Sequence, residues 1–556
     1  MDRYRSVCSA VVAACLCLSA APPILSQATV VSVASGAWSD PAVWSTGALP
    51  GEGDDVRIRP EHVVLYDVDS AAGIHILLVN GRLAFSRTTD TRLEVGLLVV
   101  TNEQSFDAAQ ACEHVPAPAG RRAALQIGSR RSPIPSGATA TVRLRYFDDL
   151  DADCAPALVN RGGHVELHGA RLDRTWTKLG ATAAAGAVEL VLAEPVDWRI
   201  GDRLIVTATD TQNQGRHPND TILDGSIVPQ TEERLLVDLS ADGTVLTLDE
   251  ALEYEHLGGA TSLDLRGEVA NLSRNVIVES AEPSGVRGHT MYHRGSTGSI
   301  GYAEFRHLGK ADTLGRYPLH FHLIADTMRG GFVDGASIWD SDNRWITVHG
   351  TEYLVIRDTV GYGALGHGFF LENGAEVYNL FQGNLGVQAY MWQPIPGQAL
   401  DWDLNDGACY WAANARNFAV DNVFVECDNA DSFILDYAPY DAEMPTEVLM
   451  PDGSRQVVDV SRLAGGLARG LEVHSHWGWG PWIRGGYFPE DEPMRFEDVR
   501  VWNTHYSIDI SGTHVVFDGV EIFDSSYGFY NNYPGSALVK NVYIENVGPH
   551  GASCTT

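Results

Sequence analysis

Positive charge is scarce in this sequence. Its 556 residues include 39 Lys and Arg against 72 Asp and Glu, which gives a formal net charge of −33 at pH 7. Nucleic-acid binding depends on a basic surface that neutralises phosphates, so the composition argues against a nucleic-acid partner. A surface this acidic is typical of a protein that its charge keeps soluble. An anionic ligand would require a local cluster of arginines.

CxxC motifs and long apolar runs are also missing. None of the eight cysteines belongs to a CxxC pair, which argues against a cysteine-based zinc site. In an exported protein, Cys112 with Cys154 and Cys409 with Cys427 are the candidate disulfides, with Cys554 left over, although the sequence does not fix the pairing. After residue 26 no apolar run is long enough for a transmembrane helix.

The first 26 residues are expected to be a secretory signal peptide. Arg3 and Arg5 precede a short apolar run, and Pro22 and further small residues follow it. The alternative is a lipoprotein-processing box that ends at Cys15 and would anchor the chain through a lipid. The first interpretation predicts a secreted protein, and the second predicts a lipid-anchored one.

Long helical periodicities are scarce, whereas Gly is abundant (56 residues) and short runs rich in β-formers recur. This balance predicts an all-β protein with many turns. From about residue 266 the runs recur at coil-length intervals, often followed by Asp or Asn, which tolerate left-handed turns. The pattern predicts a right-handed parallel β-helix. The alternative is an antiparallel sandwich, but regular two-residue hairpin turns are absent from this half.

Several long motifs resemble one family in the same order. "GAWSDPAVWSTGALPGEGDDVRI" followed by "NGRLAF" is similar to a G8 domain, and "GRYPLHFH" and "ITVHGTEYLVIRDTVGYGALGHGFFLENGAEVYNLFQGNLG" are similar to the β-helical part of the same proteins. These are the cell-surface hyaluronidases of the transmembrane-protein-2-like and cell-migration-inducing, hyaluronan-binding group. The resemblance runs from about residue 31 to about residue 550. It implies a compact secreted member that cleaves hyaluronan internally, a reaction usually described as hydrolysis.

The resemblance also implies a division of the chain. A G8 β-domain is expected over residues 29–165, a linking β-region over 166–265, and a parallel β-helix with the active site over 266–550. The oligomeric state is left open.

The strongest candidate for chemistry is "RYPLHFH" at residues 316–322. His320 and His322 are two apart, so on a strand they point to the same side. His349 and His367 follow at intervals that could stack them beside this pair, with Glu372 close by. Imidazoles and a carboxylate together could hold a divalent cation or supply a neutral base.

The residues support two reactions and one structural alternative. The catalytic candidates are His320, His322, His349, His367, Glu372 and Arg316. The metal candidates, for Ca²⁺ or Zn²⁺, are His320, His322 and His367. Hydrolysis needs a proton donor and a carboxylate, such as Glu372 or Glu376, whereas elimination needs a base and a cation beside the uronate. The structural alternative is that these histidines only hydrogen-bond within a stacked core.

A second cluster, "GLEVHSHWGWGPWIRGG" at residues 470–486, combines aromatic side chains with a cation. Aromatic faces and arginine suit an acidic glycan. The substrate-binding candidates are Tyr317, Arg344, His474, His476, Trp477, Trp479 and Arg484. Trp482 is expected to cap the core instead, and His289 and His293 could face the site from a neighbouring coil.

The sequence therefore predicts an extracellular enzyme that cleaves an acidic polysaccharide such as hyaluronan. A non-catalytic glycan-binding protein on the same scaffold is the main alternative, and a purely structural surface protein is the third. The fold cannot choose between them, because function belongs to the site.

Overall fold

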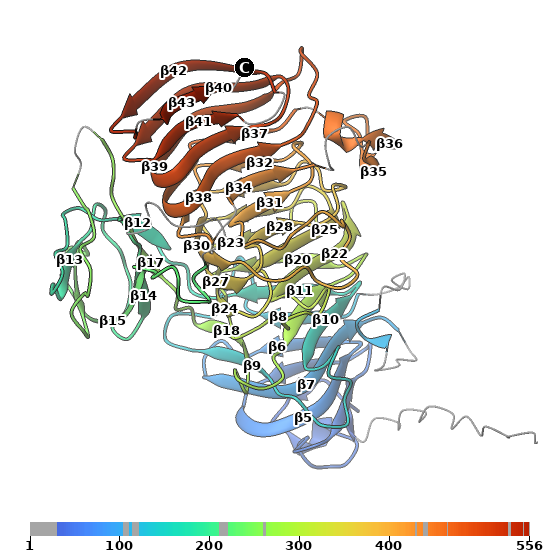
Figure 1. Ribbon diagram of the computed structural model, residues 1–556. Helices are drawn as coiled ribbons and strands as arrows, with labels where there is room; N and C mark the ends of the chain where they lie inside the picture. Colours follow the sequence, from blue (N-terminus) through green and yellow to red (C-terminus); the bar gives the residue numbers. More distant parts are fainter. Residues whose placement is uncertain are drawn as a thin grey trace, which may run out of the picture.

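The protein is an elongated stack of parallel strands (Figure 1). The computed structural model describes residues 30–103, 110–113, 122–210, 221–259, 263–428, 431–437, 443–463, 465–531, 535–548 and 550–554. Within these residues, 35 strands join into one continuous sheet. The predicted all-β fold with a parallel β-helix is confirmed. The predicted signal peptide and Cys15 lie outside the described residues.

Each coil contributes a strand to each of three faces, numbered 1 to 3 in chain order. Face 1 contains β1 (Val30–Val31), β3 (Asp55–Ile58), β10 (Ala157–Arg161), β19 (His289–Tyr292), β22 (Leu319–Ala325), β25 (Ile346–Thr351), β28 (Phe369–Leu371), β31 (Tyr410–Ala412), β34 (Asp431–Asp436), β41 (Tyr527–Asn531) and β43 (His550–Cys554). Face 2 contains β2 (Gly36–Ala37), β4 (Val63–Tyr66), β6 (Arg82–Phe85), β8 (Ala124–Ile127), β11 (His164–His168), β20 (Thr297–Gly301), β23 (Phe332–Asp334), β26 (Val355–Arg357), β29 (Leu380–Gln382), β32 (Phe418–Val420) and β37 (Leu467–Arg469).

Face 3 and the corner-turning strands complete the coils. Face 3 contains β9 (Ala140–Leu144), β18 (Val276–Ser280), β21 (Glu304–Arg306), β24 (Ser337–Ser341), β27 (Val360–Leu365), β30 (Leu385–Tyr390) and β33 (Val423–Val425). The strands that bend from one face to the next are β5 (Asp69–Val79), β7 (Thr91–Thr101), β38 (Glu472–Arg484), β39 (Met494–Ile510), β40 (Val515–Phe523) and β42 (Ala537–Glu545).

The strands of the first 165 residues are the first coils of this β-helix. On face 1, β10 pairs in parallel with β7 on one side and with β19 on the other. On face 2, β11 lies in the same way between β8 and β20. The structure therefore draws the domains differently from the sequence-based division. One solenoid runs through both predicted domains and is interrupted by an insertion.

The insertion between β11 and β18 is a small antiparallel sheet. Its strands, in sheet order, are β12 (Trp176–Lys178), β17 (Glu268–Asn271), β14 (Arg203–Val206), β15 (Glu232–Leu239), β16 (Val245–Leu248) and β13 (Glu189–Val191). It lies on the left of Figure 1, beside face 3. Ile205 and Ala270 of the insertion pack there against Trp339, Val360 and Leu385. This apolar contact fixes the insertion to the solenoid.

Alternation along each strand separates the core from the surface of a face. On β22, Leu319 and Phe321 belong to the main hydrophobic core, whereas His320 and His322 point to the other side. Phe321 stacks on Tyr292 of the preceding coil, with ring centroids 5.2 Å apart. The same alternation on β25 buries Val348 and turns His349 outward.

The corner between faces 2 and 3 repeats a left-handed residue. Gly335, Asp358, Gly383, Asp421 and Gly470 occupy this corner in successive coils, with φ between 49° and 65°. Only Gly adopts this conformation freely, and Asp and Asn tolerate it better than other residues. The predicted role of Asp after a strand is confirmed.

Two disulfides join the predicted partners. Cys112 is bonded to Cys154, and Cys409 is bonded to Cys427.

Buried asparagines hold neighbouring corners together. Asn384 donates to Ile356 O at 3.0 Å and to Asn422 Oδ1 at 2.9 Å, and its own Oδ1 accepts from Thr359 N at 3.0 Å. We expect Asn384→Ala to destabilise the fold by about 1–3 kcal/mol, because it leaves buried backbone groups without partners. Chemical denaturation measures this loss. The exposed Gln456→Ala is the control, and equal stability of the two variants would contradict the role of the ladder.

Candidate active site

A row of imidazoles and one carboxylate crosses face 1. His322 stands directly opposite His349 in the parallel pairing of β22 with β25. His293 follows β19 and lies beside His322 on the preceding coil, while Glu372 follows β28 on the next. The ring centroids of His293 and His322 are 5.4 Å apart, and those of His322 and His349 are 5.0 Å apart. Strand pairing thus brings together residues that are far apart in the sequence.

His320 adds a fourth imidazole to this row. Its ring centroid lies 4.8 Å from that of His322 and 6.1 Å from that of His349, to which it is nearly parallel. Each of His320, His322 and His349 offers a nitrogen within 4.8 Å of the other two. We call His293, His320, His322, His349 and Glu372 the histidine cluster.

Glu372 faces two of these imidazoles from within the fold. Its Oε2 lies 3.1 Å from His349 Nδ1 and 3.6 Å from His320 Nε2. These contacts are close but poorly aligned, and among the described residues none of the three atoms makes a well-formed hydrogen bond. Three buried polar atoms thus converge without satisfying one another. Such an arrangement is typical of a site that holds a ligand.

The surroundings shift the pKa values of the ionisable groups of the cluster in different directions. Burial opposes the charge of Glu372, but the charge of His349 and the neighbouring imidazole of His320 hold its pKa well below its usual range. Burial also disfavours a charged His349, yet Glu372 raises the pKa of His349 above its ordinary value. Burial lowers the pKa of His320, and burial together with the neighbouring imidazoles lowers that of His322. The cluster therefore combines neutral imidazoles with one charged pair.

Two further groups border the cluster. The ring centroid of Tyr317 lies 4.8 Å from that of His320, and its hydroxyl is buried with no hydrogen-bond partner among the described residues. Glu376 accepts hydrogen bonds from Gly350 N at 2.8 Å and Gly374 N at 2.9 Å. Burial raises the pKa of Glu376 to about 7. Because Gly350 directly follows His349, Glu376 positions the turn that carries this histidine.

His367 is not brought into the cluster. It precedes β28, and its Nε2 lies 2.8 Å from Asp403 Oδ1 while its Nδ1 accepts from Ala408 N at 3.1 Å. Its ring stacks on those of Phe370 and Trp411. Both ring nitrogens are therefore engaged in the fold, and the predicted third metal ligand is replaced in space by His349.

Arg344 is also engaged by neighbours. It is 1% exposed, its guanidinium lies over the ring of Phe370 and it pairs with Asp403 at 3.4 Å. It supports the loop that holds His367, and its burial leaves little surface for a substrate.

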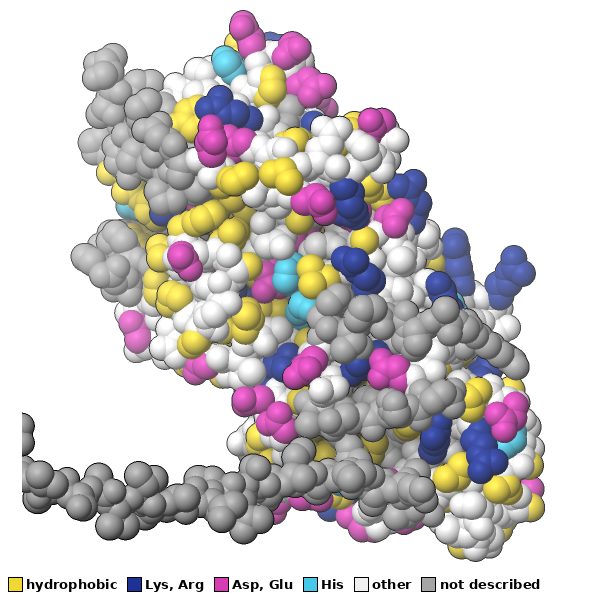
Figure 2. Space-filling model, turned by 90° about the vertical axis from the view of Figure 1, so that its right-hand side faces the viewer, with side chains coloured by type: hydrophobic (Ala, Val, Ile, Leu, Met, Phe, Trp, Pro, Cys, Tyr) yellow, Lys and Arg dark blue, Asp and Glu magenta, His cyan; other side chains and the backbone are white. Residues whose placement is uncertain are grey.

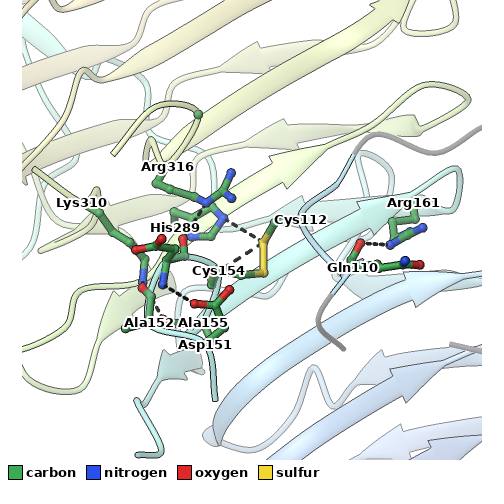
Figure 3. The surroundings of a disulfide bond; sticks show 12 residues. Gln110, Cys112, Asp151, Ala152, Cys154, Ala155, Arg161, His289, Lys310 and Arg316 are labelled. Atoms are coloured by element: carbon green, nitrogen blue, oxygen red, sulfur yellow. Dashed lines mark hydrogen bonds between the residues drawn. A yellow bond between two sulfur atoms is a disulfide. The ribbon is translucent and has the colours of Figure 1, made fainter. Parts of the chain in front are cut away.

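Arg316 lies beside the first disulfide (Figure 3). Its Nε donates to Asp153 O at 2.7 Å, while Lys310 Nζ donates to Ala152 O at 2.7 Å and to Ala155 O. The disulfide at Cys154 tethers the loop that carries all three acceptors. Burial and the charge of Arg316 lower the pKa of Lys310 to about 7. The described contacts of Arg316 thus belong to this loop.

The structure places His474 on a different face. Its Nε2 lies 3.1 Å from Glu268 Oε2 in the insertion, its ring stacks on Trp502, and it is fully buried. Lys178 of the insertion bonds both oxygens of Glu472 nearby. These groups form a buried ion network between the insertion and the solenoid, which the sequence did not predict. His476 is buried on the same strand.

The predicted aromatic residues separate into two groups. Trp477 is 5% exposed and its ring lies 4.6 Å from that of His505. Trp479 is half-buried on face 1 and stacks on Trp482 at 5.4 Å and on Tyr506 at 4.7 Å.

Arg484 stands at the end of this aromatic row. It lies over the ring of Trp482 at 5.5 Å and pairs with Asp436 at 3.4 Å. Pairing of β34 with β38 puts it on the same face as the histidine cluster.

Face 1 is open to view in Figure 2. The side of Figure 1 on which β22 and β25 are labelled faces the viewer there, and histidine side chains are exposed next to acidic ones near the middle. Within the cluster, His322 and His349 are partly exposed on this face, whereas His293, His320 and Glu372 are buried.

Two family models match the chain. Residues 43–180 match the G8 domain, and residues 285–462 match the CEMIP beta-helix, which contains the whole histidine cluster. Among the described residues, the structure has no helix long and apolar enough to cross a membrane.

Curated relatives are similar to between 40% and 93% of this chain. Human cell surface hyaluronidase CEMIP2 is 33% identical over 40% of this chain, and the zebrafish cell surface hyaluronidase is 31% identical over 41%. Human Fibrocystin-L is 27% identical over 93% of this chain. The chain spans only 16%, 17% and 12% of the length of these three proteins.

Solved structures resemble the chain weakly. A structure titled "Glycoside hydrolase" is 7% identical, with a TM-score of 0.26, over 88% of this chain and 89% of that one. The tailspike gp49 of Pseudomonas phage LKA1 is 10% identical, with a TM-score of 0.25, over 86% and 71%. The sequence matches are more specific: residues 43–180 are similar to a G8 domain and residues 285–462 to a CEMIP beta-helix, the two regions whose motifs predicted this resemblance.

Proposed function

We propose that this chain is an extracellular enzyme that cleaves hyaluronan or a related uronic-acid polysaccharide internally. The observation that carries the proposal is the convergence of four imidazoles and Glu372 from four coils at an accessible place on face 1. Core packing does not require such a group, because the apolar residues of the same strands already fill the core. The names of the two hyaluronidase relatives support a glycan substrate.

The donor set favours a transition metal ion over Ca²⁺. His320, His322 and His349 offer three nitrogens within 4.8 Å of one another, and imidazole nitrogen suits Zn²⁺, whereas Ca²⁺ prefers oxygen ligands. Three protein ligands leave a position for water or substrate, which is typical of catalytic zinc. Such an ion acts as a Lewis acid toward a glycan oxygen or a bound water.

Glu372 and Tyr317 complete the site around these imidazole ligands. Glu372 contacts His349 and His320, and this contact fixes their ring orientation. The ring of Tyr317 lies against His320 and its buried hydroxyl has no described partner, so it is the candidate donor to a sugar oxygen. These groups serve hydrolysis, in which water attacks the anomeric carbon, and the reaction products distinguish this from elimination.

The aromatic row on face 1 provides the binding surface. Trp479 and Trp482 present stacked, half-buried rings, and Arg484 places a cation beside them. Sugar rings stack on such faces and a uronate carboxylate pairs with arginine. The polymer would then run along the solenoid axis, from the aromatic row to the histidine cluster.

Removing two imidazoles tests the catalytic role. We expect His320→Ala with His322→Ala to abolish the shortening of high-molecular-mass hyaluronan while the far-ultraviolet circular dichroism remains that of the parent. Chain length is followed by size-exclusion chromatography with light scattering. A rise in ultraviolet absorbance from unsaturated ends would reassign the reaction to elimination.

The matched control is His307→Ala. His307 is a histidine of the same β-helix that pairs with Asp340 outside the cluster, so its loss should leave the shortening unchanged. If the parent chain binds hyaluronan and other acidic glycans but shortens none of them, the protein is a glycan-binding module and the enzymatic proposal is wrong.

Metal content tests the ligand set independently of activity. We expect the chelator-treated chain to take up about one Zn²⁺ per molecule, with a higher melting temperature in the loaded form because the ion binds only the folded state. His349→Ala should lose this uptake, as measured by plasma mass spectrometry, whereas His307→Ala should retain it. Equal uptake by the two variants would exclude the proposed ligand set.

A further inference from the structure

A groove lies on face 2, away from the histidine cluster. It has a volume of about 480 Å³ and is lined by residues of β6, β8 and β11 and of the turns next to β4, β6 and β8. Its walls are polar and include Arg82, Arg122, Gln126 and His164. Nothing in the proposed reaction uses these residues.

Strand pairing explains how the groove forms. In register across face 2, Arg82 stands opposite Ala124, and Ala124 stands opposite His164. The side chain of Ala124 is short, so a hollow opens above it between the long side chains of Arg82 and His164. Neighbouring strands are about 4.8 Å apart, which puts roughly 10 Å between the two walls. This width admits a sugar ring lying along the strand direction.

The carboxylate of Glu166 in the groove already has hydrogen-bond partners. Glu166 Oε1 lies 3.0 Å from His164 Nε2, and its Oε2 lies 2.5 Å from His168 Nε2 and 3.0 Å from Ser299 Oγ. Burial opposes its charge, but the hydrogen bonds with His164 and His168 lower the pKa of Glu166 to about 2. Its carboxylate therefore accepts from these three neighbours.

Arg82 and Arg122 in the groove have guanidinium N–H groups that remain available to a ligand. Arg82 Nη2 donates to the amide oxygen Oε1 of Gln126, and Arg122 Nη1 donates to Thr297 Oγ1 at 2.8 Å. Among the described residues, neither guanidinium has a carboxylate partner within 4.0 Å, and both side chains are exposed. Elsewhere on this acidic chain exposed arginines such as Arg174 and Arg203 pair with a glutamate. Because Gln126 and Thr297 are neutral, no carboxylate balances the positive charge of Arg82 or Arg122.

We propose that this groove is a second polysaccharide-binding site, in which Arg82 and Arg122 hold a carboxylate of an acidic sugar chain seated over Ala124. Guanidinium groups bind carboxylates through paired, charge-assisted hydrogen bonds. The amide group of Gln126 supplies a polar contact to the sugar hydroxyls. The proposal takes the identity of the polymer from the proposed function, but binding here needs no cleavage.

The groove and the cluster lie on two sides of one corner of the solenoid. Thr297, which bonds Arg122 and His164, opens β20 only four residues after His293. A polymer held in the groove is therefore close to face 1. The second site would raise the local concentration of the polymer at the cluster, because one chain occupies both.

Binding to a chain that does not cleave tests the groove. In the His320→Ala, His322→Ala background, we expect Arg82→Gln with Arg122→Gln to weaken the binding of fluorescent hyaluronan roughly 10- to 100-fold, as charge-assisted hydrogen bonds are lost. Fluorescence anisotropy measures the affinity, and neutral dextran shows whether the carboxylate is needed. Ala124→Tyr should weaken binding as well, because it fills the hollow and leaves both arginines in place.

Arg174→Gln with Arg203→Gln is the matched control. It removes the same two positive charges from ion pairs on the insertion, so it should bind hyaluronan like its parent. Melting temperatures confirm that each variant is folded. If the arginine pair variant binds like the control, or if dextran binds as well as hyaluronan, the groove is not an acidic-sugar site.

The outcome separates this proposal from the catalytic one. Weaker binding by the groove variants supports the second site even if the histidine variant still shortens hyaluronan. Unchanged binding by the groove variants, with cleavage abolished by the histidine variant, overturns the second site alone. Failure of the parent chain to bind hyaluronan at all overturns the groove proposal.

Discussion

Register between parallel strands is the constraint on which the candidate site depends. A parallel ladder puts one residue of each coil about 4.8 Å from its partner in the next, whatever the length of chain between them. His322 and His349 are such partners, and the same register buries Phe321 against Val348 in the core. A slip of one residue would exchange imidazoles and apolar side chains between surface and interior. The energy of the core therefore fixes the geometry of the site.

The corners maintain this register. Left-handed residues such as Asp358 and Asp421 reverse the chain at the same point of each coil, and Asn384 and Asn422 join consecutive corners. The repeated Asp and Asn after short apolar runs predicted these corners, because few residue types tolerate the conformation. The all-β class and the parallel β-helix could also be predicted, because each leaves a local pattern in the sequence. The two disulfides were only candidates, because the sequence does not fix the pairing of cysteines.

The position of a side chain that depends on the length of a turn could not be predicted from the sequence. His367 and His349 have similar sequence contexts, but His367 falls ahead of its strand, where the later loop brings Asp403 to it. His474 and Arg484 lie on one strand, yet β38 turns a corner between them, so they lie on different faces. The irregular pairing that follows His476 marks this bend, and periodicity does not reveal it. The assignment of His349 rather than His367 to the cluster therefore requires coordinates.

Charge determines where on this surface an acidic ligand would bind. A chain of net charge −33 repels an acidic polymer in general, but screening in salt limits this repulsion to about 8–10 Å. Within that range the outcome depends on local groups. Carboxylates that contact histidine or arginine, such as Glu166 and Asp436, have their charge offset. In the proposed second site, the uncompensated cations of the groove would attract the carboxylates of an acidic polymer despite the negative charge of the rest of the surface.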